Sequence, residues 1–347
     1  MKFISTVRDL MRVIQHCPND FIGIHDFSWA PHALGDAITW QMKCWIRAIE
    51  HGRKRMSWLL IADPEQPSNL LQSYITQENY LRHFQNLFPA FLCCPDTSTI
   101  HVYRSRRAAN LHLAAALAGR TQVWPSLADH VRRNVEYTMP HHDINAFYRR
   151  HGTIPRLTAP RGYERSVDGF LRSHARDKFV VAVHIRQRRL TEAPGGVHRD
   201  SRFEAWYEFF EMVASKHPSI LFVTLGGYSE WEKDLLKHRN VVVMRSIGYG
   251  LAEELTLLHH SNLFLGTSSG FSAAATFSAV PYIVTNFEHA AAKPLGIKVG
   301  DASYPFALPH QRLSWKIETP TLLFELFEQE FEALQQQEAA RRESMRG

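Results

Sequence analysis

Short apolar runs of strand length recur along the C-terminal half of the chain. They consist largely of valine, isoleucine, leucine and phenylalanine, which is typical of strands buried on both faces of a parallel sheet. The predicted strands are residues 178–185, 220–225, 240–245, 263–266 and 282–285. Stretches with helical periodicity separate them, at residues 202–216, 230–238, 251–260 and 270–279. Strands and helices that alternate in this way predict βαβ units around a parallel sheet.

The N-terminal half shows the same alternation in a less regular form. Strands are predicted at residues 21–25, 58–62 and 100–103, and helices at residues 36–51 and 110–118. Residues 120–160 contain four prolines and no clear strand, and we expect the link between two domains near residues 155–177. A final helical pattern at residues 320–342 carries one apolar stripe, and such a helix is expected to pack back onto a domain.

Length, composition and charge narrow the class of protein. The chain has 347 residues, enough for two domains of about 100–200 residues each. Hydrophobic residues make up 45%, and no run approaches the roughly 18 apolar residues of a membrane-spanning helix. Residues 1–9 lack the apolar stretch of a signal peptide, which predicts a cytoplasmic location and reduced cysteines. A net charge of +6 suits a nucleotide, an acidic glycan, nucleic acid or a membrane surface.

A basic cluster ends the strand predicted at residues 178–185. His184 and Arg186 alternate with Ile185, so their side chains point to the same side. Open parallel sheets bind ligands beyond the carboxyl ends of their strands, and the arginine fork matches a phosphate. In the alternative interpretation, Arg186 only pairs with an acidic residue at the edge of the sheet.

A hydroxyl-rich turn follows the strand predicted at residues 263–266 and leads into a helix of small residues. The turn contains Thr267, Ser268, Ser269, Gly270 and Ser272. Free N–H groups and the dipole of a helix start favour an anion, and the small residues let a phosphate approach closely. Ordinary N-capping is the alternative, but capping needs one hydroxyl rather than several.

A third candidate region lies in the N-terminal half, after the strand predicted at residues 21–25. Gly35 allows the backbone to turn against a ligand, and Asp36 places a carboxylate at the start of the following helix. The alternative is that Asp36 only caps that helix.

Several motifs with a known chemistry are absent from the sequence. It contains no Gly-x-x-x-x-Gly-Lys-Ser/Thr loop of nucleotide triphosphatases and no Gly-x-Gly-x-x-Gly after the first strand. The adjacent histidines at 141–142 and 259–260 lack the spacing of metal ligands, and no Asp-x-Asp element accompanies them. We therefore predict no metal site.

The order of these segments resembles a family of enzymes. His184-Ile185-Arg186, followed later by the turn Thr267–Ser272, looks like the GDP-fucose-binding half of the α1,6-, nodulation and protein O-fucosyltransferases. The similarity covers roughly residues 178–286 and reaches the N-terminal half only through Gly35 and its helix. Gly35-Asp36 also resembles the Gly-Asp start of bacterial heptosyltransferases, which share the same architecture.

By this resemblance the fold is of the GT-B type, an α/β fold with two Rossmann-like domains that face each other across a cleft. Residues 1–165 are then the N-terminal acceptor-side domain. Residues 166–320 are the C-terminal nucleotide-sugar-binding domain, and residues 321–347 are a C-terminal helix that packs back.

The resemblance also implies roles for the motif residues. Arg186 binds the β-phosphate, His184 lies near the nucleoside, and the serine-rich turn with Gly270 binds the diphosphate. The acidic residue that recognises guanine in the family has its matching place at Asn262, a departure that affects the choice of base. The acid that often follows the His-x-Arg motif is replaced by Gln187-Arg188-Arg189.

We predict an inverting, metal-independent glycosyltransferase that needs no cofactor. It would move a sugar, fucose by the resemblance, from a nucleoside-diphosphate sugar to a glycan or another hydroxyl acceptor. Arg186 and the helix start at Gly270 stabilise the leaving diphosphate. Asp36 is the first candidate for the base that deprotonates the acceptor, and Asp26 is the second.

Two other kinds of function remain open. The enzymatic alternatives are a nucleotide-sugar epimerase and a heptosyltransferase-like enzyme. The alternative without catalysis is a basic nucleic-acid-binding protein, which needs exposed aromatic residues. Here Phe203, Trp206 and Phe210 fall on the core stripe of a predicted helix, so we expect no nucleic-acid partner. The basic charge also permits association with a membrane surface.

Overall fold

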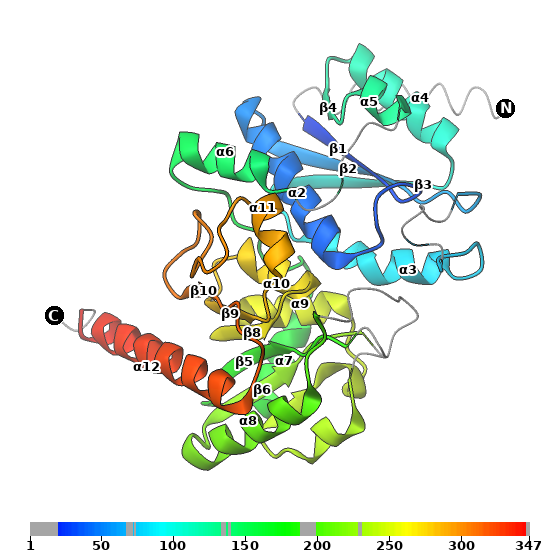
Figure 1. Ribbon diagram of the computed structural model, residues 1–347. Helices are drawn as coiled ribbons and strands as arrows, with labels where there is room; N and C mark the ends of the chain where they lie inside the picture. The colour runs from blue at the N-terminus through cyan, green and yellow to red at the C-terminus, as the bar shows by residue number, and fades with distance from the viewer. Residues whose placement is uncertain are drawn as a thin grey trace. The chain divides into compact units, whose positions relative to one another are not determined.

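A computed structural model describes residues 20–66, 72, 74–132, 137, 140–187, 199–227 and 231–344 of the chain (Figure 1). The chain divides into two compact units, residues 1–160 and 161–347. Each unit contains a parallel sheet flanked by helices, so the predicted α/β architecture with two Rossmann-like domains is confirmed. No helix in the described ranges is both long and apolar enough to cross a membrane. Residues 1–9, from which the sequence analysis predicted that no signal peptide is present, lie outside those ranges.

The first unit is built on a four-stranded sheet with the strand order β3-β2-β1-β4. Its strands are β1 (Asp20–Asp26), β2 (Arg55–Ile61), β3 (Thr97–Tyr103) and β4 (Gln122–Trp124). Its helices are α2 (Leu34–Glu50), α3 (Tyr80–Leu87), the 3-10 helix η2 (Phe88–Leu92), α4 (Arg106–Ala118), α5 (Leu127–Arg132) and α6 (His142–His151). The prediction missed α3 and η2, and it also missed β4, α5 and α6. The last three lie in the proline-containing region, where short elements leave little periodic pattern.

The two faces of this sheet are covered by different helices. Ile22 and Ile24 of β1 pack in one apolar cluster with Leu113 of α4. On the other face, a Cβ on Gly23 would lie 2.6 Å from the ring of Trp58 and 3.0 Å from Cys44 Sγ of α2. Glycine therefore lets α2 and the buried indole approach β1 closely.

The second unit is built on a six-stranded parallel sheet with the order β10-β9-β8-β5-β6-β7. Its strands are β5 (Phe179–His184), β6 (Ile220–Thr224), β7 (Val241–Val243), β8 (Leu263–Thr267), β9 (Tyr282–Thr285) and β10 (Gln311–Leu313). Its α-helices are α7 (Glu164–His174), α8 (Phe203–Lys216), α9 (Leu251–His260), α10 (Gly270–Thr276), α11 (Ala292–Leu295) and α12 (Pro320–Ser344). Short 3-10 helices lie at η5 (Lys233–Lys237), η6 (Met244–Ile247) and η7 (His289–Ala291).

The five strands predicted for the second unit are confirmed, and three features differ from prediction. The sheet gains β10, whose three residues were not recognised as a strand. Helix α7 occupies the region that was expected to be a link. The helix predicted at residues 230–238 is the shorter 3-10 helix η5 within the described residues.

Alternation along β5 separates the two faces of this sheet. Val181 and Val183 pack in a core cluster with Phe209 of α8 and with Leu323 and Phe327 of α12. His184 points to the opposite face, where its ring lies 4.9 Å from the ring of Phe271 in α10. Side chains of the last helix thus form part of the hydrophobic core of the unit.

Candidate nucleotide site

The six-stranded sheet has a topological switch point between β5 and β8. The chain proceeds from β5 to β6 and β7, and then places β8 on the other side of β5. Open parallel sheets bind ligands at such a point, outside the carboxyl ends of the strands. His184 at the end of β5 faces Gly266 of β8 in register. Both segments chosen from the sequence, at residues 184–186 and 267–272, therefore leave the sheet at the same edge.

Close approach of the two strands depends on Gly266. A Cβ at this position would lie 2.8 Å from the carbonyl oxygen of His184, closer than real Cβ atoms come to backbone. Any larger residue here would push β8 away from β5 at the switch point.

Arg186 is paired with an acidic residue that comes later in the chain. Its Nη1 donates to Asp200 Oδ1 over 2.5 Å, and both side chains are buried. The backbone N–H of Ser201 donates to the carbonyl of Arg186 over 2.9 Å, and the side-chain amide of Gln187 donates to the carbonyl of Ser201. No acidic residue directly follows the His-x-Arg motif. Asp200, fourteen residues after Arg186, supplies the acidic partner instead.

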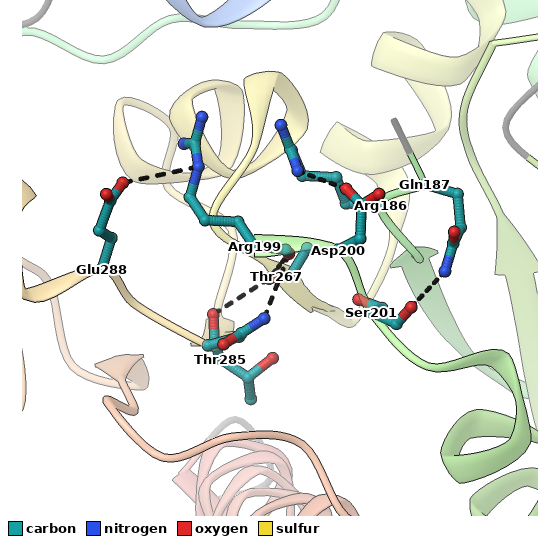
Figure 2. A network of polar contacts seen from close by, with 9 residues as sticks. Arg186, Gln187, Arg199, Asp200, Ser201, Thr267, Thr285 and Glu288 are labelled. Atoms are coloured by element: carbon teal, nitrogen blue, oxygen red, sulfur yellow. Dashed lines mark hydrogen bonds and ion pairs between the residues drawn. The ribbon is translucent and has the colours of Figure 1, made fainter. Parts of the chain in front are cut away.

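We call residues 199–201 the return segment, because it crosses back over the carboxyl edge of the sheet (Figure 2). The carbonyl oxygen of Arg199 accepts from Thr267 Oγ1 over 3.5 Å and from Asn286 Nδ2 over 3.1 Å. Thr267 ends β8 and Asn286 follows β9, so the return segment ties the ends of three neighbouring strands together.

The hydroxyl-rich turn makes several internal hydrogen bonds. Ser269 caps α10: its Oγ accepts from the N–H of Ser272 over 3.4 Å, and Ser272 Oγ accepts from the N–H of Ser269 over 2.8 Å. Thr267 is buried and donates within the sheet edge. The turn has four hydroxyl residues, Thr267, Ser268, Ser269 and Ser272. Among them, only the hydroxyl of Ser268 makes no hydrogen bond within the described residues. Ordinary capping therefore explains two of the hydroxyls, and Ser268 is the one available to a ligand.

Residues 266–270 have the Gly-x-Ser-x-Gly spacing of a hydrolase nucleophile elbow, a motif that the sequence prediction wrongly took to be absent. A serine nucleophile needs a hydrogen bond to a histidine base. Ser268 has no such bond in the described part of the chain, so the geometry does not favour a hydrolase.

A buried carboxylate lies beneath this edge. Glu318 Oε1 accepts from Thr285 Oγ1 over 2.6 Å, and Oε2 accepts from Trp206 Nε1 over 3.0 Å. Burial raises the pKa of Glu318, while these donors and the nearby His184 oppose the rise. The residue joins the segment before α12 to the end of β9, next to the candidate site.

Asn262 lies at the end of β8 opposite the candidate site, so the structure does not favour its predicted role in base recognition. It precedes β8, where its Oδ1 accepts from the N–H of Val180 over 2.8 Å at the start of β5. The length of β8 separates it from the carboxyl edge, roughly 16 Å at about 3.3 Å per residue. The strand predicted at residues 263–266 already placed Asn262 before the start of the strand, away from its carboxyl end.

The first unit has its own switch point, between β1 and β4. Asp26 ends β1 but is fully buried, accepts from Ser28 Oγ over 2.8 Å and pairs with Arg106 Nη2 over 2.7 Å. Because of this burial and pairing, the structure does not favour Asp26 as the acceptor base. Gly35 and Asp36 lie in the first turn of α2, which begins at Leu34 and has no side-chain cap.

Two histidines accompany β1 and the loop that follows it; His25 is fully buried and His32 is half-buried. Burial lowers the pKa of His25 to about 3 and that of His32 to about 4. The ring nitrogens of His25 have no hydrogen-bond partner among the described residues, and Phe27, Phe91 and Tyr137 surround the ring. Neutral imidazoles are therefore the stable form here at neutral pH.

Sequence reasoning missed four residues at the candidate site. They are Arg199, Asp200, Thr285 and Glu318. None follows a motif, and each reaches the site through the tertiary path of the chain. Within the described ranges, no three His, Cys, Asp or Glu side chains gather closely enough to hold a metal ion.

No protein-family model matches the chain, and no curated protein matches its sequence. Among solved structures, a family 9 glycosyltransferase from Veillonella parvula matches with a TM-score of 0.50 and 9% identity, over 85% of this chain and 84% of that chain. The ADP-heptose LPS heptosyltransferase II of E. coli matches with a TM-score of 0.53 and 10% identity, over 92% and 99%. These matches show the GT-B fold of glycosyltransferases.

The fucosyltransferase subgroup is not confirmed. An α-1,6-fucosyltransferase, NodZ, soaked with GDP-fucose matches with a TM-score of only 0.33 and 11% identity, over 76% of this chain and 93% of that chain. This likeness is too weak to assign the chain to fucosyltransferases.

Proposed function

We propose that the chain is a glycosyltransferase that binds a nucleoside-diphosphate sugar at the carboxyl edge of β5 and β8. One observation carries the proposal: the segments at residues 184–186 and 267–272 flank the switch point of a sheet in a GT-B fold. The turn before α10 supplies a hydroxyl and small residues for phosphate oxygens, and His184 lies next to it.

The proposed reaction is a direct displacement at the anomeric carbon, with inversion. An acceptor hydroxyl oxygen forms the new bond as the bond from carbon to the diphosphate oxygen breaks, and the diphosphate leaves with the electron pair. Cationic groups at the sheet edge stabilise this charge, so the chemistry needs no resident divalent ion. In this proposal the hydroxyl proton passes to Asp36, which lies in the first turn of α2.

The donor and the acceptor separate the candidate functions. Fucose is the sugar suggested by the motif order, and heptose is suggested by the E. coli enzyme of similar fold, whose name includes ADP-heptose. A glycan or another hydroxyl compound is the proposed acceptor. An epimerase would release an altered sugar without any acceptor, so transfer to an added acceptor distinguishes the two.

The nucleic-acid-binding alternative is not favoured. Trp206, Phe209 and Phe210 are fully buried in the core against α12, so they have no face on which bases can stack.

A thermal-shift panel tests the proposal. The full chain is heated with ADP, GDP, UDP or dTDP, with and without EDTA. One of them should raise the melting temperature selectively, because a ligand at 100 times its Kd stabilises by about 2.7 kcal/mol. EDTA should leave this shift unchanged. No shift with any of the four would contradict nucleotide-sugar binding.

A further inference from the structure

Two arginines stand at the carboxyl edge of the six-stranded sheet, and their surroundings differ (Figure 2). The side chain of Arg186 is 5% exposed and that of its partner Asp200 is 4% exposed, with 2.5 Å between Nη1 and Oδ1. Such a pair is neutral overall, and a buried charge left without its partner is strongly unfavourable. Arg186 is therefore poorly suited to exchange Asp200 for an incoming phosphate.

Arg199 is held much more loosely. Its side chain is 28% exposed and its Nε lies 3.6 Å from Glu288 Oε2, on a side chain that is 31% exposed. The guanidinium donates no hydrogen bond to any described residue, and its Nε is buried without an acceptor. Because ion pairs between partly exposed side chains contribute little, an anion with better geometry can displace Glu288.

The backbone of Arg199 is nevertheless fixed in place. Its carbonyl accepts from Thr267 Oγ1 and Asn286 Nδ2, at the ends of the neighbouring strands β8 and β9. Asp200, the next residue, is anchored to Arg186. An anchored backbone thus holds Arg199 next to Thr267, where the turn begins, while its guanidinium points towards Glu288 and keeps unused donors (Figure 2).

We infer that Arg199 supplies the charged contact to the diphosphate of the donor, and that Arg186 holds the return segment that presents it. This inference rests on the proposed function and adds a binding residue outside the His-x-Arg motif. The planar fork of an arginine has five N–H donors and binds phosphate oxygens in a bidentate manner. The chemical class of the ligand is therefore a nucleoside diphosphate or its sugar ester.

Calorimetric titration of the full chain tests the assignment. The probes are the nucleoside diphosphate that stabilises the wild-type chain in the panel of ADP, GDP, UDP and dTDP, and the corresponding nucleoside. Arg199→Gln should weaken diphosphate binding about 10- to 100-fold, because a hydrogen bond to a charged group is lost. Binding of the nucleoside should stay within about twofold, since it has no phosphate. Glu288→Gln should strengthen diphosphate binding by up to about fivefold, because a competing carboxylate is gone.

Arg202→Gln is the matched control. Arg202 is exposed in the same unit, three positions along the chain, and its side chain makes no capping bond to α8. Its variant should bind the diphosphate like wild type. Diphosphate affinity of Arg199→Gln within twofold of wild type overturns the inference while the proposed function stands. A wild-type chain that binds none of the four diphosphates removes the proposed function itself.

Discussion

The buried pair between Arg186 and Asp200 allows a quantitative prediction. Asp200→Asn keeps the shape of the side chain but removes its charge, so the buried guanidinium of Arg186 loses the carboxylate that lies 2.5 Å from its Nη1. Breaking a buried ion pair on one side costs about 3–5 kcal/mol. For a unit of the size of residues 161–347, each kcal/mol lowers the melting temperature by about 2–4 °C. We therefore expect the transition of the second unit to fall by about 6–20 °C.

A double variant separates the charge effect from the loss of shape. Arg186→Met combined with Asp200→Leu replaces the pair by two apolar side chains, a change that is often neutral or stabilising in a buried site. Its melting temperature should return most of the way to that of the wild-type chain. Differential scanning calorimetry is the suitable measurement, because it can resolve separate transitions of the two units.

The same variants distinguish the two roles considered for Arg186. If the pair only fixes the return segment, the two apolar side chains pack in its place, keep Arg199 in position and preserve nearly wild-type affinity for the nucleoside diphosphate. If Arg186 itself binds the β-phosphate, the double variant loses affinity although it is stable. An Asp200→Asn transition within about 2 °C of wild type would refute the reasoning, since it would show that the pair contributes less than about 1 kcal/mol.

Two further predictions concern the first unit. Burial lowers the pKa of His25 to about 3, whereas the unfolded chain protonates near 6.5, so stability is complete above pH 6.5 and is lost as the pH falls towards 3. His25→Phe removes this titration and keeps a ring within the aromatic cluster. Below pH 6, urea unfolding should show that the free energy of unfolding falls less steeply with pH than in wild type, by up to about 1.4 kcal/mol per pH unit. An unchanged slope would contradict the assignment. Asp36→Asn should lower turnover by about 10²–10⁴-fold and leave nucleotide affinity unchanged if Asp36 is the base, as steady-state kinetics and calorimetry can show. Near-normal turnover would exclude that role.

Much of the fold followed from the sequence because its signals are local. The apolar runs that became β5, β6, β8 and β9 are continuous and buried on both faces, so each could be recognised without its neighbours. The position of His184 and Arg186 at a strand end has the same origin, since it depends only on where the apolar run stops. Elements of three residues, such as β4 and β10, were missed because three positions carry no period.

The contacts of the candidate site required the tertiary structure. The order of the strands in the sheet decides that β5 and β8 are neighbours. The end of a strand at which a residue lies decides whether the residue can reach a ligand. Asn262 lies at the start of β8, away from the carboxyl edge. The partner of Arg186 could not be found by spacing, because Asp200 returns to the sheet over an intervening segment. The exposure that separates Arg199 from Arg186 is a property of packing. The sequence thus determined which groups stand near the ends of strands, whereas folding decided which charges are neutralised and which stay available, because pairing and burial depend on residues far apart in the chain.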